Sequence, residues 1–455
     1  MSSQFKELAD KYYLKALNSL KEFVSINTIN DQNTVSKEHP FGNGVEKGLS
    51  FIAKLGRELG FNVDRCDNYV TELSIGNGPL VDIYAHADVV PVSKTWKTDP
   101  FVPTIINNVM YARGASDDKG PGIASLYAAK AVLDTFGIEG YKLRIIFGGD
   151  EERGSACLDH YFNVLKKEYP KYGFSPDADF PLIYGEKSIY SYSASYNIHL
   201  ESIEPFTFGN ALNIVLDEAN IKLDSAKYAT QILKYQNDYP EVKLNYDNGI
   251  LHFKGQAAHG STPWNGVNAG LHLLNFLGFV LHMPILNRIF ENYESGNGED
   301  FNGNYTSEHF DSSSYNVGKI AYENGKLTLF VNMRLPENVD VNKALDNLKK
   351  ETKIDDLVLL SSSKGFVYDP KSKFVQTLLK TYQEETGDLT SQMEAIGGGT
   401  YSRETKNTVA FGMQFPGVDT LMHQDGEFLR LDDFKKGIAI YAHAIYELGK
   451  LAKNK

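Results

Sequence analysis

The chain has 455 residues, enough for two or three domains with cores of their own, and its formal net charge is −12. This acidic balance argues against nucleic acid as the main partner, because phosphate binding requires a basic surface. The charged first residues lack the apolar core of a signal peptide, and no run of about 18 apolar residues occurs, so we expect no export signal and no membrane partner.

Only two cysteines occur, Cys66 and Cys157. Two cysteines are too few for a disulfide framework or a thiolate zinc cluster. We therefore expect both to be buried packing residues in a protein of the cytoplasm, where thiols stay reduced.

The first part of the chain alternates amphipathic helices with short apolar strands. Helices are predicted over 5–25, 48–60, 121–137 and 155–169, and strands over 80–85 and 142–149. This order predicts an α/β fold with a mostly parallel sheet covered by helices.

From about residue 190 the pattern changes to half-buried antiparallel strands around a strong helix over 268–283. The α/β pattern returns after residue 369, with helices over 374–387 and 434–452. We therefore predict a discontinuous catalytic domain (1–189 and 369–455) interrupted by an α+β lid domain (190–368). The polar segment 295–315, rich in Gly, Asn and Ser, is predicted to be a long mobile loop that tunes access.

Polar motifs follow the predicted elements of the first domain. The string HADVVP places His86 and Asp88 directly after a buried strand, where neutral imidazole is a common metal ligand and a nearby carboxylate orients the ring. The string ARGASDDKGPG places Asp117 and Asp118 before a helix. Taken alone, a surface turn explains the first motif equally well, and ordinary helix capping is the commoner explanation of the second.

Three further motifs complete the set. GGDEERGS puts Glu151 and Glu152 after another buried strand, SPDADFP carries Asp177 and Asp179, and MHQDGEF carries His423. Strand ends of an open α/β sheet converge on one crevice, so we expect these side chains to gather there. Two histidines and several carboxylates suit zinc, manganese or cobalt, and the excess of carboxylates over one tetrahedral site predicts two divalent ions.

The five motifs, in this order, resemble those of the co-catalytic dinuclear metallopeptidases, the superfamily of carnosinase, aminoacylase and succinyl-diaminopimelate desuccinylase. The strings AHADVVP, ARGASDDKGP, GGDEERGS, SPDADFPLIYGEK, AAHGSTP and IGGGTYSR are most similar to the bacterial PepV-type dipeptidases, which cleave β-Ala-His and Xaa-His. The similarity spans essentially the whole chain.

The resemblance implies a role for each matching residue of the metal site. It makes Asp117 the ligand that bridges two ions, with His86 and Asp177 on one ion and His423 and Glu152 on the other. It makes Glu151 the general base for a hydroxide that bridges the metals, and Asp88 the residue that orients His86. The neighbours Asp118 and Asp179 remain alternatives to Asp117 and Asp177.

The resemblance also implies substrate contacts. His259 in AAHGSTP would stabilise the oxyanion, and Asn213 would touch the substrate. Arg334 would pair with the C-terminal carboxylate of the substrate, which Gly398, Gly399 and Arg403 would line. The alternatives are a structural role for His259 and surface ion pairs from Arg334 to Glu337 or Asp340.

We therefore expect a metal-dependent dipeptidase that takes short peptides with a free C-terminal carboxylate. Its expected cofactors are two divalent ions, zinc first and manganese or cobalt as the alternatives. A monomer is favoured, and a homodimer is the alternative. Two other functions stay open: an N-acyl amino acid deacylase of the same superfamily, and a catalytically silent binding homologue.

Overall fold

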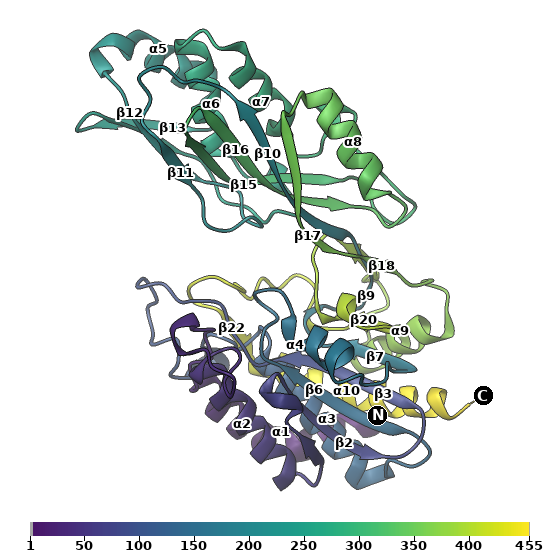
Figure 1. The fold of residues 1–455 in the computed structure, drawn as a ribbon. Helices are drawn as coiled ribbons and strands as arrows, with labels where there is room; N and C mark the ends of the chain where they lie inside the picture. Colours follow the sequence, from purple (N-terminus) through teal and green to yellow (C-terminus); the bar gives the residue numbers. More distant parts are fainter. Residues whose placement is uncertain (1–2, 455) are drawn as a thin grey trace. The chain divides into compact units, whose positions relative to one another are not determined.

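The structure is a computed structural model that describes residues 3–454, and the chain folds as two compact units (Figure 1). The first unit contains the chain up to Gly185, Tyr368–Glu394, and the chain from Thr400 onward; the second contains Glu186–Val367 and Ala395–Gly399. These bounds lie close to the predicted domain limits. The difference is the segment 395–399, which groups with the second unit and not with the predicted domain over 369–455.

The first unit is built on a mixed sheet whose order runs β1-β2-β6-β3-β7-β20-β9. The central strands β6, β3, β7 and β20 run parallel, while β2 joins β6 and β9 joins β20 in the antiparallel sense. The strands of the unit are β1 (Asn62–Asp64), β2 (Val70–Gly76), β3 (Leu80–His86), β4 (Thr104–Ile106), β5 (Val109–Tyr111), β6 (Lys142–Gly148), β7 (Tyr172–Ser175), β8 (Ala178–Asp179), β9 (Ile183–Glu186), β20 (Thr408–Ala410), β21 (Met413–Gln414) and β22 (Phe428–Arg430). Two short strands, β18 (Phe366–Val367) and β19 (Glu394–Ile396), lie at the bounds of the units.

Helices cover both faces of this sheet. They are α1 (Gln4–Val24), α2 (Asn43–Glu58), α3 (Lys119–Phe136), α4 (Ala156–Asp159), α9 (Lys373–Thr386) and α10 (Leu431–Lys453). Successive side chains of a strand point to opposite faces. On β3, Ala85 faces Gly122 of α3, while the ring of Tyr84 contacts Phe162 in the π-helical turn η3 (His160–Val164) that follows α4. The helix-covered, centrally parallel sheet confirms the predicted α/β class.

The second unit contains a five-stranded antiparallel sheet in the order β11-β15-β16-β10-β17 and a three-stranded sheet in the order β12-β14-β13. Alternate side chains of β10 and β16 are buried in one apolar core together with α6 and α7. The elements are β10 (Ser188–Asn197), β11 (Phe206–Phe208), β12 (Glu218–Lys222), β13 (Lys243–Asp247), β14 (Ile250–Lys254), β15 (Ser314–Glu323), β16 (Lys326–Leu335), β17 (Asp356–Ser363), α5 (Ser225–Asp238), α6 (Ala269–Val280), α7 (Pro284–Glu294) and α8 (Val341–Thr352).

One expectation about local structure needs correction, and one strand was not expected. The helix expected over 155–169 ends at Val164, because the chain turns there before Pro170. Strand β2 was not expected, since its polar residues Thr71 and Glu72 interrupt the apolar pattern. Segment 295–315 is irregular apart from the 3₁₀ turn η5 (Glu299–Phe301) and the start of β15, and the rings of Phe301 and Phe310 within it are buried.

Both cysteines are free and buried, as expected. Among the described residues, no helix combines the length and the hydropathy that crossing a bilayer requires.

Candidate metal centre

The centre lies at the carboxyl ends of the parallel strands of the first unit. His86 is the last residue of β3 and pairs with Gly148 at the end of β6, so the acidic segment 150–152 follows immediately beside it. Asp177 follows β7, the neighbour of β3 on its other side. Asp117 precedes α3, whose first turn packs under β3. Parallel pairing therefore brings together side chains that are far apart in the sequence.

Asp117 lies between the two histidines. Its Oδ1 is 2.9 Å from Nε2 of His86, and its Oδ2 is 2.7 Å from Nε2 of His423. Around His86, Oδ2 of Asp177 is 3.7 Å from the same Nε2. Around His423, Oε2 of Glu152 is 3.2 Å from Nε2. Two groups thus share the carboxylate of Asp117.

These separations suit ligands that share a cation. Two ligand atoms with bonds of roughly 2 Å to a tetrahedral ion lie about 3.3 Å apart. The donors of His86, Asp117 and Glu152 lie within 4.8 Å of one another, as do those of His86, Glu151 and Asp177. In addition, Oε1 of Glu152 is buried with no hydrogen-bond partner in the described part of the chain. The donor set therefore fits hard or borderline divalent ions.

The pKa shifts of the metal-free protein are those expected of a cluster of metal ligands. Burial, followed by the charges of neighbouring carboxylates, raises the pKa of Glu151 and of Asp177 well above their usual values. Burial disfavours the protonated ring of His86 and by itself would lower the pKa. The contacts of the ring with Asp117 and Asp88 outweigh this effect, so the pKa of His86 is raised. Without a cation the folded cluster holds protons that the ions would replace.

Asp88 contacts His86 through its backbone carbonyl and not through its carboxylate. Nδ1 of His86 lies 2.9 Å from the backbone carbonyl oxygen of Asp88, but 3.6 Å from its carboxylate. The carboxylate itself accepts hydrogen bonds of 3.1 Å from the backbone N–H groups of Glu151 and Glu152. The carbonyl thus orients the ring, and the carboxylate holds the acidic segment.

The alternatives Asp118 and Asp179 point elsewhere. Oδ2 of Asp118 accepts a hydrogen bond from the backbone N–H of His86 at 3.0 Å. Oδ1 of Asp179 accepts one from Nε2 of Gln414 at 2.8 Å. Asp117 and Asp177 are therefore the members of each pair that face the imidazole of His86.

The expected substrate residues of the predicted lid domain gather within the second unit. Nε2 of His259 lies 3.5 Å from Nη2 of Arg334, and the backbone of Asn213 accepts a hydrogen bond from Gly260. Arg334 is buried, and it donates to Asn332 and to the carbonyl of Gly397. The surface alternatives have partners of their own: Glu337 accepts from Ser307, and Asp340 caps α8.

Gly398 and Gly399 belong to the second unit, whereas Arg403 lies in the first unit, in the 3₁₀ turn η6 (Tyr401–Glu404). The same turn contains Tyr401, which is not among the predicted site residues. Its buried ring packs edge-on against the ring of His86 at 6.2 Å between centroids. Tyr401 could have been predicted from its place in the string GGGTYSR, which carries other predicted site residues.

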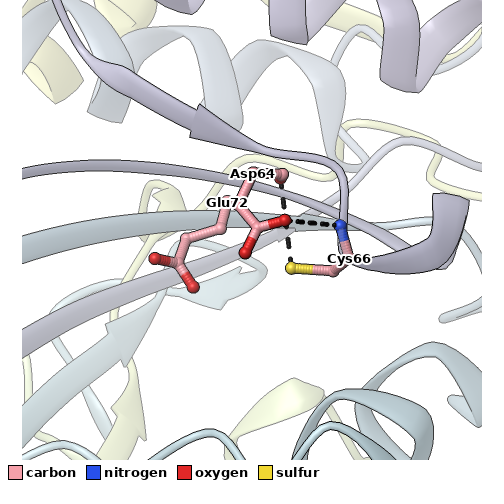
Figure 2. A group of neighbouring side chains, drawn as sticks. All are labelled: Asp64, Cys66 and Glu72. Atoms are coloured by element: carbon pink, nitrogen blue, oxygen red, sulfur yellow. Dashed lines mark hydrogen bonds between the residues drawn. The ribbon is translucent and has the colours of Figure 1, made fainter.

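A second acidic group, of Asp64, Cys66 and Glu72, also lies within metal-binding range (Figure 2). Here a cation is already present, because Nζ of Lys167 is 2.8 Å from Asp64 and 3.0 Å from Glu72. Burial also raises the pKa of Cys66 to about 12, so its thiol stays protonated. We interpret this group as a structural ion-pair cluster.

The chain is similar to known proteins over nearly its whole length. A family model described as "Peptidase family M20/M25/M40" matches residues 83–447. A Staphylococcus haemolyticus protein named "Putative dipeptidase" is 33% identical over 98% of this chain and 99% of the relative, and one from Staphylococcus aureus strain MW2 is 32% identical over the same shares.

Solved structures share the fold at low sequence identity. Human carnosine dipeptidase 1 superposes with a TM-score of 0.62 at 14% identity, covering 98% of both chains. The di-peptidase Dug1p of Saccharomyces cerevisiae has a TM-score of 0.62 at 14% identity, covering 99% of both chains.

Proposed function

Because this chain belongs to peptidase family M20/M25/M40, we propose that it is a metal-dependent dipeptidase that cleaves short peptides with a free C-terminal carboxylate. One observation carries the proposal: the carboxylate of Asp117 lies between His86 and His423, with one oxygen facing each ring. The near full-length similarity to relatives named as dipeptidases supports the choice of substrate.

The residues that would hold the ions form two sets around a shared ligand. His86, Asp117 and Asp177 form one, and His423, Asp117 and Glu152 form the other. We propose zinc as the resident metal, with manganese or cobalt as alternatives, because imidazole and carboxylate donors suit all three. Two such cations, when bound, polarise the scissile carbonyl and make the attacking water more acidic.

Glu151 is the proposed general base. Its carboxylate lies beside His86 and Asp177, and burial raises its pKa, so it can both accept and release a proton. It takes a proton from the attacking water as the oxygen bonds to the carbonyl carbon. It then gives that proton to the leaving nitrogen as the C–N bond breaks, which yields two amino acids.

Residues of the second unit are proposed to bind the substrate. His259 lies beside Arg334, and the guanidinium of Arg334 is held by Asn332 and Gly397. A guanidinium fixed in this way presents a planar donor group for a carboxylate. We propose that Arg334 pairs with the C-terminal carboxylate and that His259 stabilises the oxyanion; Asn213, Gly398, Gly399 and Arg403 complete the proposed set.

The test is a hydrolysis panel with enzyme reconstituted with Zn²⁺ or Mn²⁺. We expect turnover of dipeptides, and little turnover of N-acetyl or N-succinyl amino acids, which a deacylase would prefer. Glu151→Ala should lower kcat by about 10²- to 10⁴-fold while both ions remain bound. Equal turnover by the variant and the parent would contradict the mechanism, and preference for acylated amino acids would contradict the substrate.

A further inference from the structure

Glu427 is a fully buried carboxylate that the proposed chemistry does not use. It lies four residues after His423 and immediately before β22. The side chain of His423 is about half exposed, and its backbone has a φ of 63° in the left-handed region. Glu427 is a fully buried charged residue of the segment that carries this histidine.

The carboxylate of Glu427 binds the segment that carries Asp117. Its Oε2 accepts from Nη1 of Arg113 at 2.6 Å and from the backbone N–H of Gly114 at 3.2 Å. Its Oε1 accepts from the backbone N–H and the hydroxyl of Ser116, at 2.9 and 3.1 Å, and from the backbone N–H of Asp117 at 3.2 Å. Both oxygens are therefore saturated with donors, one of them cationic.

The backbone continues the same connection. The N–H of Ala112 donates to the carbonyl of Glu427 at 3.3 Å, and β22 then pairs with β5 in the antiparallel sense. One residue thus joins the loop before α3 to the segment after His423 through its side chain and its main chain. A carboxylate can accept all of these hydrogen bonds, whereas an amide in its place would turn an NH₂ group toward N–H donors.

We propose that Glu427 is a positioning residue that holds the carboxylate of Asp117 in place between His86 and His423. The inference rests on the proposed dinuclear site and adds a residue that sets its geometry without touching an ion. Residues that hydrogen-bond to metal ligands fix the orientation of those ligands. Removal of such a residue typically weakens metal binding by about 10- to 100-fold.

The test is titration of the full-length, chelator-stripped protein with Co²⁺, followed by calorimetry and by the visible absorption of the bound ion. We expect Glu427→Gln to raise the Kd for Co²⁺ by about 10- to 100-fold and to change the absorption band, since the Asp117 carboxylate loses its fixed position. A Kd within threefold of the parent value would overturn the proposal.

Asp82→Asn is the matched control. Asp82 is also a fully buried carboxylate of the first unit, paired with Arg144 and hydrogen-bonded by Tyr84, and it lies on β3 four residues before His86. We expect this variant to lower the Tm, as Glu427→Gln does, and to leave the Kd for Co²⁺ within threefold. An equal rise in Kd for both variants would show a general loss of stability and overturn the proposal.

Ser116→Ala covers the case in which Glu427→Gln does not fold. It removes only the hydroxyl bond to Glu427, and it should raise the Kd for Co²⁺ by about two- to tenfold. An unchanged Kd would count against the proposal. Failure of the proposed function has a different signature, because the parent protein would then bind Co²⁺ without hydrolysing dipeptides. Failure of the dinuclear site itself would leave the parent protein without a Co²⁺ pair.

Discussion

The carboxylate of Asp88 accepts a hydrogen bond from the backbone N–H of Glu151 at 3.1 Å. A residue expected to orient a metal-binding histidine therefore also sets the position of the proposed general base. The backbone carbonyl of the same residue lies against the ring of His86. The two functions are divided between main chain and side chain, so a substitution of the side chain tests only one of them.

Asp88→Asn should lower kcat by about 10- to 100-fold, because the amide can accept from only one of the two N–H groups that the carboxylate binds. Steady-state kinetics on a dipeptide checks this. Asp64→Asn is a suitable control, since Asp64 also accepts a backbone N–H, that of Cys66, but lies outside the centre. A kcat for Asp88→Asn within twofold of the parent would contradict the assignment.

Asp177→Asn and Asp179→Asn should behave differently, although only one residue separates the two positions. Asp177 faces His86, so we expect Asp177→Asn to retain fewer than two ions. Its kcat should fall by more than roughly 100-fold, the usual upper effect of removing a residue that only hydrogen-bonds to a metal ligand. Asp179 bonds to Gln414, so its variant should keep both ions. Metal analysis of the purified variants decides, and the reverse pattern would show that Asp179 is the ligand.

Removal of the metals should destabilise the protein, and more so at pH 8 than at pH 6. The raised pKa values of Glu151 and Asp177 mean that the metal-free folded state keeps protons that the unfolded chain releases as the pH rises above the ordinary carboxylate range. The raised pKa of His86 acts in the same direction. The stability that it contributes to the folded state is fully present below pH 6.5, the usual pKa of histidine, and is lost as the pH rises through the raised pKa. Stability of the metal-free protein therefore falls with rising pH.

Each ion present at a hundred times its Kd should add about 2.7 kcal/mol to the free energy of unfolding. Thermal unfolding of loaded and chelated protein at both pH values measures this difference. At a fixed metal concentration, the difference in Tm between the loaded and the chelated protein should be larger at pH 8, because fewer protons compete with the metal for its ligands there. A gap that narrows from pH 6 to pH 8 would contradict the protonation pattern of the cluster.

Arg334→Lys should raise the KM for dipeptides by roughly tenfold or more, because an ammonium group cannot form the two parallel hydrogen bonds of a guanidinium. A dipeptide amide, which lacks the carboxylate, serves as the matched substrate, and its KM should change little. Equal changes for the two substrates would mean that Arg334 supports the structure of the second unit without binding the carboxylate.

Local sequence patterns were sufficient for the elements that carry the centre. The apolar runs before His86 and before the acidic segment 150–152 predicted β3 and β6, and both strands form where expected. Polar residues at the ends of parallel strands converge for a topological reason, so the gathering of His86, the acidic segment 150–152 and Asp177 could be anticipated. The pattern failed at β2, where buried polar residues interrupt the apolar run.

The α/β class, the order of the motifs and the types of donor available follow from the printed sequence, because they depend on the local period of apolar side chains and on residue chemistry. The contacts between individual atoms became known only from the folded chain. The tertiary structure assigned the carboxylate of Asp88 to backbone N–H groups, and it joined Glu427 to the loop before α3. Such contacts depend on the pairing and register of strands distant in the chain, and spacing along the sequence does not encode them.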